Sequence, residues 1–597
     1  MKKLLLITTF LFTLTFYAQD NPDFYLAPNG MTCLCPEAEF GDTGTLTING
    51  EAKTFTKRSR AQLIAFFYYN DQQNPDITLT CTSGISDMGF MFYNATSFDQ
   101  PLNNWDVSNV TDMAAMFYGA TSFNQPLDSW DVSNVTDMKS MFYATSFNQP
   151  LDSWDVSNVT GMNIMFYNAT SFNQPLNSWD VSNVTNMRSM FNRAESFDQP
   201  LDNWDVSQVT SMASMFANAA SFNQPLNNWN VSNVTYMSGM FANATSFNQP
   251  LNNWDVSKVK NMIGMFSRTP FNQPLNSWDV SSVTNMEGMF NRAASFNQPL
   301  NSWDVSNVID MGSMFDGAKS FDQFLDSWDV SNVSNMKFMF YGAESFDQPL
   351  NNWDVSNVTD MAVMFYLAIS FDQPLNNWDV SQVWVMEAMF SYAESFNQPL
   401  NNWDVSQVTD MRIMFQNAES FNQPLDNWDI SGVTAMYSMF RGASSFDQPL
   451  NNWDISQVTG MGSMFLSATS FNQDLLGWCV EQIPNEPQGF AFNSALQDDF
   501  FPNWGAECNL STTNPDAIGF NILIYPNPSN SKVFIENDGQ IILSKIKLID
   551  MLGRDIKIFS ASQITHGLDV SGVDAGNYFV QFTTVDNQQF VRRLIVK

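Results

Sequence analysis

The chain is organised by WDVSNVTDMAAMF, residues 105–117, which recurs with few changes over most of its 597 residues. Sixteen tryptophans, from Trp105 to Trp478, follow one another at intervals of 25 residues, except for two intervals of 24 that end at Trp154 and Trp278. A repeat of this length is one structural unit that cannot bury its apolar face alone, so neighbouring units must stack. The repeats therefore decide the fold.

Each repeat combines two apolar spacings. The segment from Leu102 to Val107 ends in the alternation of a short strand, whereas the apolar residues from Val110 to Phe117 step by three and four, as on one face of a helix. Thr111 stands where a helix N-cap would stand. We expect a strand, a turn, a short capped helix and an irregular return, with the tryptophans, valines, methionines and phenylalanines as core. The predicted fold class is an α/β repeat solenoid, with parallel strands on its concave face and short helices on its convex face.

The pattern L-x-x-W-x-V-x-x-V-x-x-M-x-x-M-F resembles the BspA-like leucine-rich repeat. The whole unit is similar to the 25-residue repeat of bacterial surface proteins. The resemblance extends from about Ser83 to Cys508, and it implies a right-handed curved solenoid with strands on its concave face. By analogy it implies adhesion or another binding role, although a fold does not by itself establish a function.

The amino end has the composition of a secretory signal. Lys2 and Lys3 precede an apolar run from Leu4 to about Phe16, and small or polar residues follow near Ala18. This run is shorter than the ~20 residues of a membrane-spanning helix, and no later apolar run reaches that length. We expect export without a transmembrane anchor.

The carboxyl end carries a second set of motifs. From about Ile518, alternating apolar strands are separated by Gly, Asn and Asp turns, which predicts a small β-sandwich. The ordered motif residues are Tyr525, Pro526, Asn527, Pro528, Gly553, Arg554, Gly576, Asn577 and Tyr578. They resemble the C-terminal sorting domain of type IX secretion substrates. This resemblance implies contact with the type IX machinery, attachment to surface lipopolysaccharide, and an outer-membrane surface or extracellular location.

These features predict six parts along the chain. The N-terminal cap includes TLTINGEAKTFT, which predicts a hairpin that turns at Asn49-Gly50. The parts are a signal peptide (1–19), an N-terminal cap (20–82), the repeats (83–478), a degenerate capping repeat (479–508), a linker (509–517) and the sorting domain (518–597).

Five cysteines fit an oxidising compartment. Cys479 and Cys508 bracket the degenerate last turn, and Cys35 and Cys81 bracket the segment before the repeats. We expect one disulfide at each end of the repeats. Cys33 is left over, and it could replace Cys35 in its bridge.

Composition bears on partners and on catalysis. The 60 acidic residues outnumber the 25 basic ones, which argues against nucleic acid and an anionic membrane face as partners. The single histidine, His566, belongs to the predicted sorting domain, so the repeats offer no Ser-His or Cys-His pair, and the chain has no Cys-x-x-Cys zinc motif. Because carboxylates recur in every repeat instead of gathering in one cleft, we expect no enzyme activity.

An aspartate follows the tryptophan in fourteen of fifteen repeats, and Asn230 is the exception. Since the flanking Trp and Val face the core, the predicted strand points this aspartate outward on the concave sheet. Stacked ~4.8 Å apart, neighbouring carboxylates repel by about 1 kcal/mol in water. The column comprises Asp106, Asp131, Asp155, Asp180, Asp205, Asp255, Asp279, Asp304, Asp329, Asp354, Asp379, Asp404, Asp429 and Asp454.

Three interpretations of this column remain open. Each carboxylate could accept local backbone N–H groups in an Asx turn, aided by the serine two residues on. Alternatively, Ca²⁺ could lie between successive carboxylates and neighbouring Asn or Ser oxygens, and it is the one cofactor that the sequence suggests. The column could also bind a regular cationic or hydroxyl-rich polymer.

The residues between the two methionines vary from repeat to repeat, unlike the aspartate column. Selective recognition is therefore expected on this varied face, and Phe324 and Trp384, which replace the usual Pro and Thr, are candidate exposed anchors. The predicted function is a secreted, non-catalytic surface protein that adheres to or binds a protein, glycoprotein or polysaccharide. The alternative is a passive structural spacer or surface-layer component, which calcium could stabilise.

Overall fold

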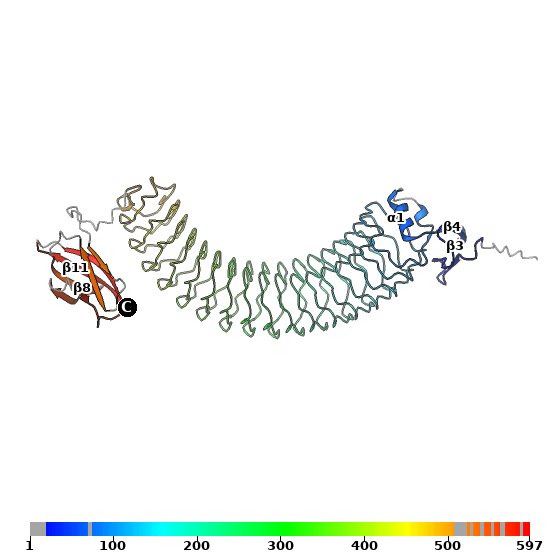
Figure 1. Ribbon diagram of the computed structural model, residues 1–597, viewed down its shortest axis with the longest axis horizontal. Helices are drawn as coiled ribbons and strands as arrows, with labels where there is room; N and C mark the ends of the chain where they lie inside the picture. The colour runs from blue at the N-terminus through cyan, green and yellow to red at the C-terminus, as the bar shows by residue number, and fades with distance from the viewer. Residues whose placement is uncertain are drawn as a thin grey trace, which may run out of the picture. The chain divides into compact units, whose positions relative to one another are not determined.

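The computed structural model divides the chain into two compact units, Met1–Glu507 and Cys508–Lys597, each described by itself (Figure 1). The predicted signal peptide and linker lie outside the described residues. The structure describes residues 20–69, 75–506, 522–525, 529, 531–537, 543–550, 554–560, 567–585 and 589–597.

The first unit begins with a cap of small sheets and one helix. The predicted hairpin at Asn49-Gly50 is confirmed, with φ of 52° and 82° at its two turn residues. Leu63 of the helix and Ile77 join the core of the repeats. The elements are β1 (Tyr25–Leu26), β2 (Cys33–Leu34), β3 (Thr43–Ile48), β4 (Glu51–Lys57), α1 (Arg60–Tyr69), η1 (Pro75–Ile77) and β5 (Thr80–Cys81), paired β1-β2 and β3-β4-β5.

The predicted α/β solenoid, with a leucine-rich-repeat-like strand and a helix in each repeat, is wrong. Residues 82–497, described without a gap, contain no α-helix and no strand longer than an isolated bridge. Instead, successive repeats are coils joined by single parallel bridges that run from Asp87 through Asp112 to Gly460 (Figure 1). These bridges lie where the first helical turn was expected, and the Trp-Asp-Val segment takes part in none of them.

Backbone donors explain why no helix forms. The N–H groups of Met113 and Ala115 donate to carbonyls of the next repeat, at Asp137 and Lys139, over 2.9 and 2.8 Å. An α-helix would direct these donors to carbonyls four residues back. Thr111, the predicted N-cap, caps no helix: its N–H and its hydroxyl both donate to the Ser86 carbonyl, at 2.9 and 3.2 Å.

Two left-handed residues per repeat make a helix impossible. Ala115 has φ 53° and Gly119 has φ 68°, and equivalent residues recur in every repeat. Each is the third residue of a β-turn; the Met116 N–H, for example, donates to the Met113 carbonyl at 3.2 Å. The three- and four-residue spacing of the apolar positions thus comes from consecutive β-turns that bury the same side.

The predicted core residues are buried. Each repeat contributes Leu, Trp, Val, two Met and two Phe side chains to one continuous cluster, with exposures of 0–4%. Identical rings stack between repeats: the tryptophan centroids are 6.3–6.5 Å apart, as between Trp130 and Trp154. The phenylalanines after the second methionine, from Phe92 to Phe465, are only 5.3–5.9 Å apart.

Successive repeats are therefore closer on the methionine side than on the tryptophan side. We call residues 111–119 and their equivalents the inner face, and residues 105–108 and their equivalents the outer face. The stack is concave on the inner face, because there the repeats approach most closely. The aspartate column lies on the outer, convex face, which is the reverse of the prediction.

Two side-chain ladders tie the repeats together. In the fifteen repeat tryptophans from Trp130 to Trp478, the indole N–H donates to the leucine carbonyl of the preceding repeat, as from Trp130 to Leu102 at 2.9 Å. The Asn124 Oδ1 accepts both the backbone N–H of Asn148 at 2.8 Å and the Gln149 amide at 3.1 Å. Because an aspartate supplies the same oxygen, both Asn and Asp occur at this position along the chain.

The far end of the stack closes with rings that no longer lie parallel. Phe490 packs edge-on against Phe465, Phe501 and Trp504, at interplanar angles of 82–90°. The 3-10 helix η2 (Asp498–Phe500) lies in the chain between Phe490 and Phe501 of this cluster. The column of parallel rings therefore stops here instead of offering a surface to a further repeat.

The second unit consists of two antiparallel sheets that share one core. Val533 and Leu568 from the three-stranded sheet pack with Ile546, Val580 and Leu594 from the four-stranded sheet. The sheets have the orders β10-β7-β6 and β12-β11-β8-β9. The strands are β6 (Ile522–Tyr525), β7 (Lys532–Asn537), β8 (Leu543–Asp550), β9 (Asp555–Ser560), β10 (Leu568–Asp569), β11 (Gly576–Thr584) and β12 (Gln589–Val596).

The left-handed positions can be tested at Gly442. Its φ is 68°, and a Cβ there would meet the side chain of Asn417. We expect Gly442→Ala to destabilise the repeats by about 1–2 kcal/mol, seen as a lower midpoint of thermal unfolding. Gly460→Ala is the control, because a Cβ at Gly460 meets no atom within 4 Å and φ is not positive. Equal effects of the two substitutions would contradict the turn assignment.

Candidate binding surfaces of the repeats

The outer-face aspartates share one hydrogen-bond pattern, and all of them except the buried Asp106 are exposed. The Asp131 Oδ1 accepts the Ser133 N–H at 3.1 Å and its hydroxyl at 2.6 Å. All fourteen aspartates and Asn230 accept the N–H of the serine two residues on, over 2.9–3.2 Å. The structure thus agrees with the interpretation of the column as Asx turns.

This hydrogen bonding favours the ionised carboxylate. The serine hydroxyl, and then the serine N–H, lower the pKa of five column members below the ordinary value of 3.8. These residues are Asp155, Asp205, Asp255, Asp329 and Asp379.

A lowered folded-state pKa fixes the direction of the pH dependence. The stabilisation is present above the unfolded-state pKa and is lost as pH falls through the folded-state pKa. We therefore expect the thermal midpoint to fall between about pH 5 and about pH 3. The measurement is made in high salt, which screens the repulsion between neighbouring carboxylates. A midpoint that rises as the pH is lowered from about 5 to about 3 would show that relief of repulsion between carboxylates outweighs the loss of their hydrogen bonds.

The wide outer spacing is unfavourable for shared Ca²⁺. Two oxygens that bind one Ca²⁺ are at most about 5.2 Å apart, whereas the adjoining tryptophans repeat every 6.3–6.5 Å. In the part of the chain that the structure describes, no three His, Cys, Asp or Glu side chains gather where they could hold a metal ion.

Calcium is therefore expected to act on the repeats only as an electrolyte. We expect millimolar Ca²⁺ to shift the thermal midpoint no more than NaCl of equal ionic strength, because each carboxylate is held singly in its own turn. A shift specific to Ca²⁺ would return the aspartate column to the status of a cation site.

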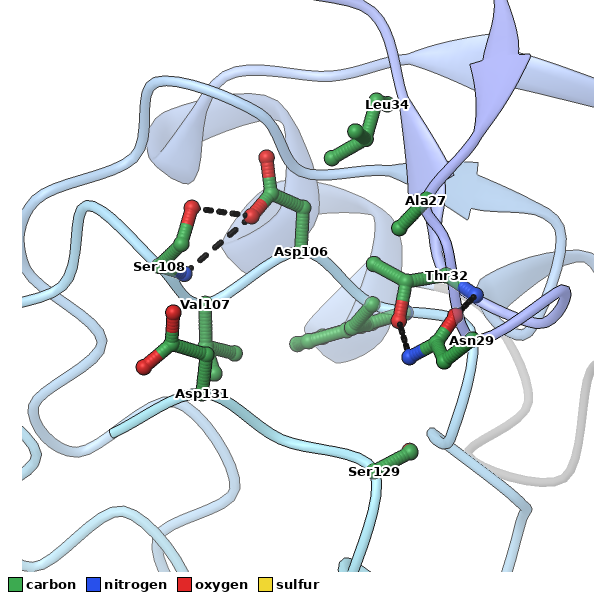
Figure 2. Close-up of a pocket in the computed structure, with 10 residues that line it drawn as sticks. Ala27, Asn29, Thr32, Leu34, Asp106, Val107, Ser108, Ser129 and Asp131 are labelled. Carbon is green, nitrogen blue, oxygen red and sulfur yellow. Dashed lines mark hydrogen bonds between the residues drawn. The ribbon is translucent and has the colours of Figure 1, made fainter. Parts of the chain in front are cut away.

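Two cavities open between successive repeats on the outer face. One, of about 220 Å³, lies where the N-terminal cap meets the first repeats, and Asp106, Ser108, Asp131, Asn29 and Thr32 line it (Figure 2). Asp106 is only 5% exposed and also accepts the Ser83 hydroxyl.

The second cavity, of about 350 Å³, has the same position in the repeat. Asn351, Asp354, Asn377 and Asp379 line it. Both cavities present carboxylates, and amides or hydroxyls, from neighbouring repeats. Both cavities lie on the outer face because the repeats are further apart there.

The inner face carries the side chains that vary between repeats. Tyr93, Tyr118, Tyr143 and Tyr167 form a column with ring centroids 4.8, 4.0 and 4.9 Å apart. Burial, followed by the hydrogen bond with Tyr143, raises the pKa of Tyr118. Because these rings cover one another's faces, the column presents ring edges and hydroxyls.

The two anchors suggested by the sequence are exposed, Trp384 by 54% and Phe324 by 57%. Trp384 lies on the inner face, and so does Tyr437, which was not predicted from the sequence and is 51% exposed. A usable signal was present, since Tyr437 is an aromatic residue at a position otherwise occupied by small, charged, amide or aliphatic residues. Ile309, at the position equivalent to Trp384, is 53% exposed.

The cysteines occupy both ends of the stack. Cys35 and Cys81 form a disulfide, and Cys33 is free and buried. Burial, and secondarily the charge of Asp106, raise the pKa of Cys33 to about 12. Cys479 is disulfide-bonded, whereas Cys508 lies outside the described residues.

The sorting motif is described only in part. Tyr525 ends β6, Gly576 begins β11, and the Tyr578 hydroxyl donates to the Asp574 carbonyl at 2.9 Å. Arg554 pairs with Asp550 at 2.6 Å. Pro526, Asn527, Pro528, Gly553 and His566 lie outside the described residues.

Comparison with protein families assigns both parts of the chain. The model described as "Mycoplasma protein of unknown function, DUF285" matches five times, over residues 61–179, 165–270, 251–351, 323–423 and 396–504. The chain belongs to the DUF285 family. The BspA-like leucine-rich repeat is not confirmed. No curated protein and no solved structure matches the chain.

The carboxyl end of this DUF285 protein matches the "Secretion system C-terminal sorting domain" over residues 523–597. This match assigns the protein to type IX secretion and places it at the cell surface or in the extracellular space. Among the helices that the structure describes, none has the length and apolar character needed to cross a membrane.

Proposed function

We propose that this exported DUF285 protein binds protein or glycan partners through the surface of its repeats, as an adhesin or matrix-binding protein, and catalyses no reaction. The supporting observation is the contrast between its two faces. The outer face repeats Asp and Ser almost without change, whereas the residue after the first methionine on the inner face runs Ala114, Lys139, Asn163, Arg188.

This contrast favours recognition over a purely mechanical role. The inner-face side chains project from turns whose backbone is fixed by hydrogen bonds to both neighbouring repeats: the Ala114 carbonyl accepts the Phe90 N–H, and the Ala115 N–H donates to the Lys139 carbonyl. Variation at such positions changes the surface without changing the fold, as in other repeat proteins with extended binding surfaces. Catalysis is disfavoured because the carboxylates recur once per repeat, each held by its own serine, instead of converging on one site.

A passive spacer or surface-layer component is the second candidate. It is favoured by the unbroken ladder of the sixteen repeat tryptophans from Trp105 to Trp478, whose indole N–H groups each donate to a carbonyl in the segment before them. Such ladders give stiffness without a ligand. Attachment of the chain to surface lipopolysaccharide after sorting belongs to either candidate.

The two candidates differ in binding. We expect the full-length protein to bind at least one member of a panel of immobilised collagen, mucin and neutral or acidic polysaccharides saturably, and to release no product from any of them. Competition by excess soluble protein controls for non-specific adsorption. Non-saturable binding to the whole panel would leave the spacer as the better account, and turnover of a member would contradict the non-catalytic role.

A further inference from the structure

Two exposed aromatic residues, Trp384 and Tyr437, lie on the inner face between Trp353 and Gly442, and further exposed aromatic residues of this face are Phe90, Tyr93 and Tyr236. Trp384 replaces a threonine, yet its N–H still donates to the Thr359 carbonyl at 3.2 Å, so the backbone ladder is intact while the indole is exposed. Tyr437 extends over the next repeat, where a Cβ at Gly462 would lie 3.1 Å from its ring. Exposed Trp and Tyr are the side chains that most often dominate protein interfaces.

The same repeats contain bulky residues in left-handed backbone. Val363, Leu367, Tyr392 and Ile413 have φ of 63°, 57°, 59° and 51°. Equivalent positions elsewhere are mostly Gly, Asn, Ser or Ala, and the exceptions include Ile164 and Phe338. A β-branched or bulky side chain is strained in this region, and such strain concentrates at functional sites.

Two buried hydroxyls without a partner lie in these repeats as well. Ser391 and Ser438 are 0% exposed, and neither hydroxyl has a hydrogen-bond partner. Between residues 83 and 478, described throughout, they are the only buried side-chain nitrogen or oxygen atoms in this condition. Each adjoins an inner-face tyrosine, Tyr392 or Tyr437, and each is a cost to stability.

Two costs, strained backbone and unpaired hydroxyls, therefore coincide in the few neighbouring repeats that carry Trp384 and Tyr437. Random drift of the repeat would scatter strained backbone and unpaired hydroxyls along the stack. A binding surface accounts for the coincidence, because recognition is commonly retained at the expense of stability.

The charge of this segment defines the partner. Five of the eleven carboxylates between residues 353 and 442 lie at or next to inner-face positions, together with two arginines: Asp360, Glu387, Glu394, Asp410, Glu419, Arg412 and Arg441. One of the arginines, Arg412, is already held by Asp410 at 2.7 Å and Glu387 at 3.2 Å. The segment is therefore acidic around its aromatic residues, and it repels an acidic partner while attracting a basic one.

We propose that the inner-face side of residues 353–442, with Trp384 and Tyr437 as anchors, docks a protein segment whose apolar side chains are flanked by lysine or arginine. This inference rests on the proposed binding function and specifies its partner chemistry. Trp384 and Tyr437 lie two repeats apart, about 10 Å along the stack at ~4.8 Å per step. A short peptide segment can contact both.

The test uses a phage-displayed library of random 12-residue peptides selected on the full-length protein. The reverted variant carries Trp384→Thr and Tyr437→Ala, residues that other repeats have at these positions. The matched control is Ile309→Thr, which removes an equally exposed apolar residue from the same column outside the segment. Selected peptides are synthesised, and their affinities are measured by fluorescence anisotropy at low and high salt.

We expect peptides that combine aromatic or aliphatic residues with Lys or Arg, that bind at least tenfold more weakly to the reverted variant, and that bind Ile309→Thr like the parent. High salt weakens their binding. The reverted variant should unfold at the same or a higher temperature, so that lost binding is not lost folding. Peptides that bind parent and reverted variant equally, or no selected peptide at all, would overturn the inference. Saturable binding in the matrix panel would still uphold the proposed function.

Discussion

The structure depends on backbone hydrogen bonds that leave one repeat and end in the next. In the Met-x-x-Met-Phe segment, alternate N–H groups, such as those of Ala115 and Phe117, donate to carbonyls 24 residues further along. A single repeat cannot satisfy these donors, and an unpaired buried N–H is costly. Stacking is therefore obligatory, and its register is fixed to the residue.

This exact register places identical side chains in columns, and these columns form the inner and outer faces of the stack. On the inner face the spacing is set by direct backbone bonds, and on the outer face by the larger separation of stacked indoles, 6.3–6.5 Å. The outer aspartates lie beside these indoles, and each carboxylate is held as an anion by hydrogen bonds from its own serine, as Asp131 is by Ser133. The inner face, stabilised by its backbone, is free to vary.

The sequence predicted burial well and secondary structure poorly. Spacings of three and four identified the buried Val, Met and Phe residues, but consecutive β-turns bury one side with the same period as a helix. The frequent Gly and Asn at the second left-handed position, as at Gly119 and Asn168, was the available signal for turns. The need of each buried indole N–H for an acceptor also pointed to contacts between repeats.

The binding surfaces were predictable only in part. The Asx turns follow from Asp and Ser two residues apart, and Trp384 was recognisable because it breaks a column of threonines. The strain at Val363 and Ile413 and the unpaired hydroxyls of Ser391 and Ser438 were not predictable, because neither φ nor a missing hydrogen bond can be derived from a sequence pattern. The central claim is that the repeats are stacked turns without helices. The amide I infrared spectrum of the full-length protein tests this claim most directly, because the stacked tryptophan rings do not dominate that band. The account predicts a helical contribution no larger than that of α1 and the short 3-10 turns, whereas a strong helical band, equivalent to a short helix in each repeat, would contradict it.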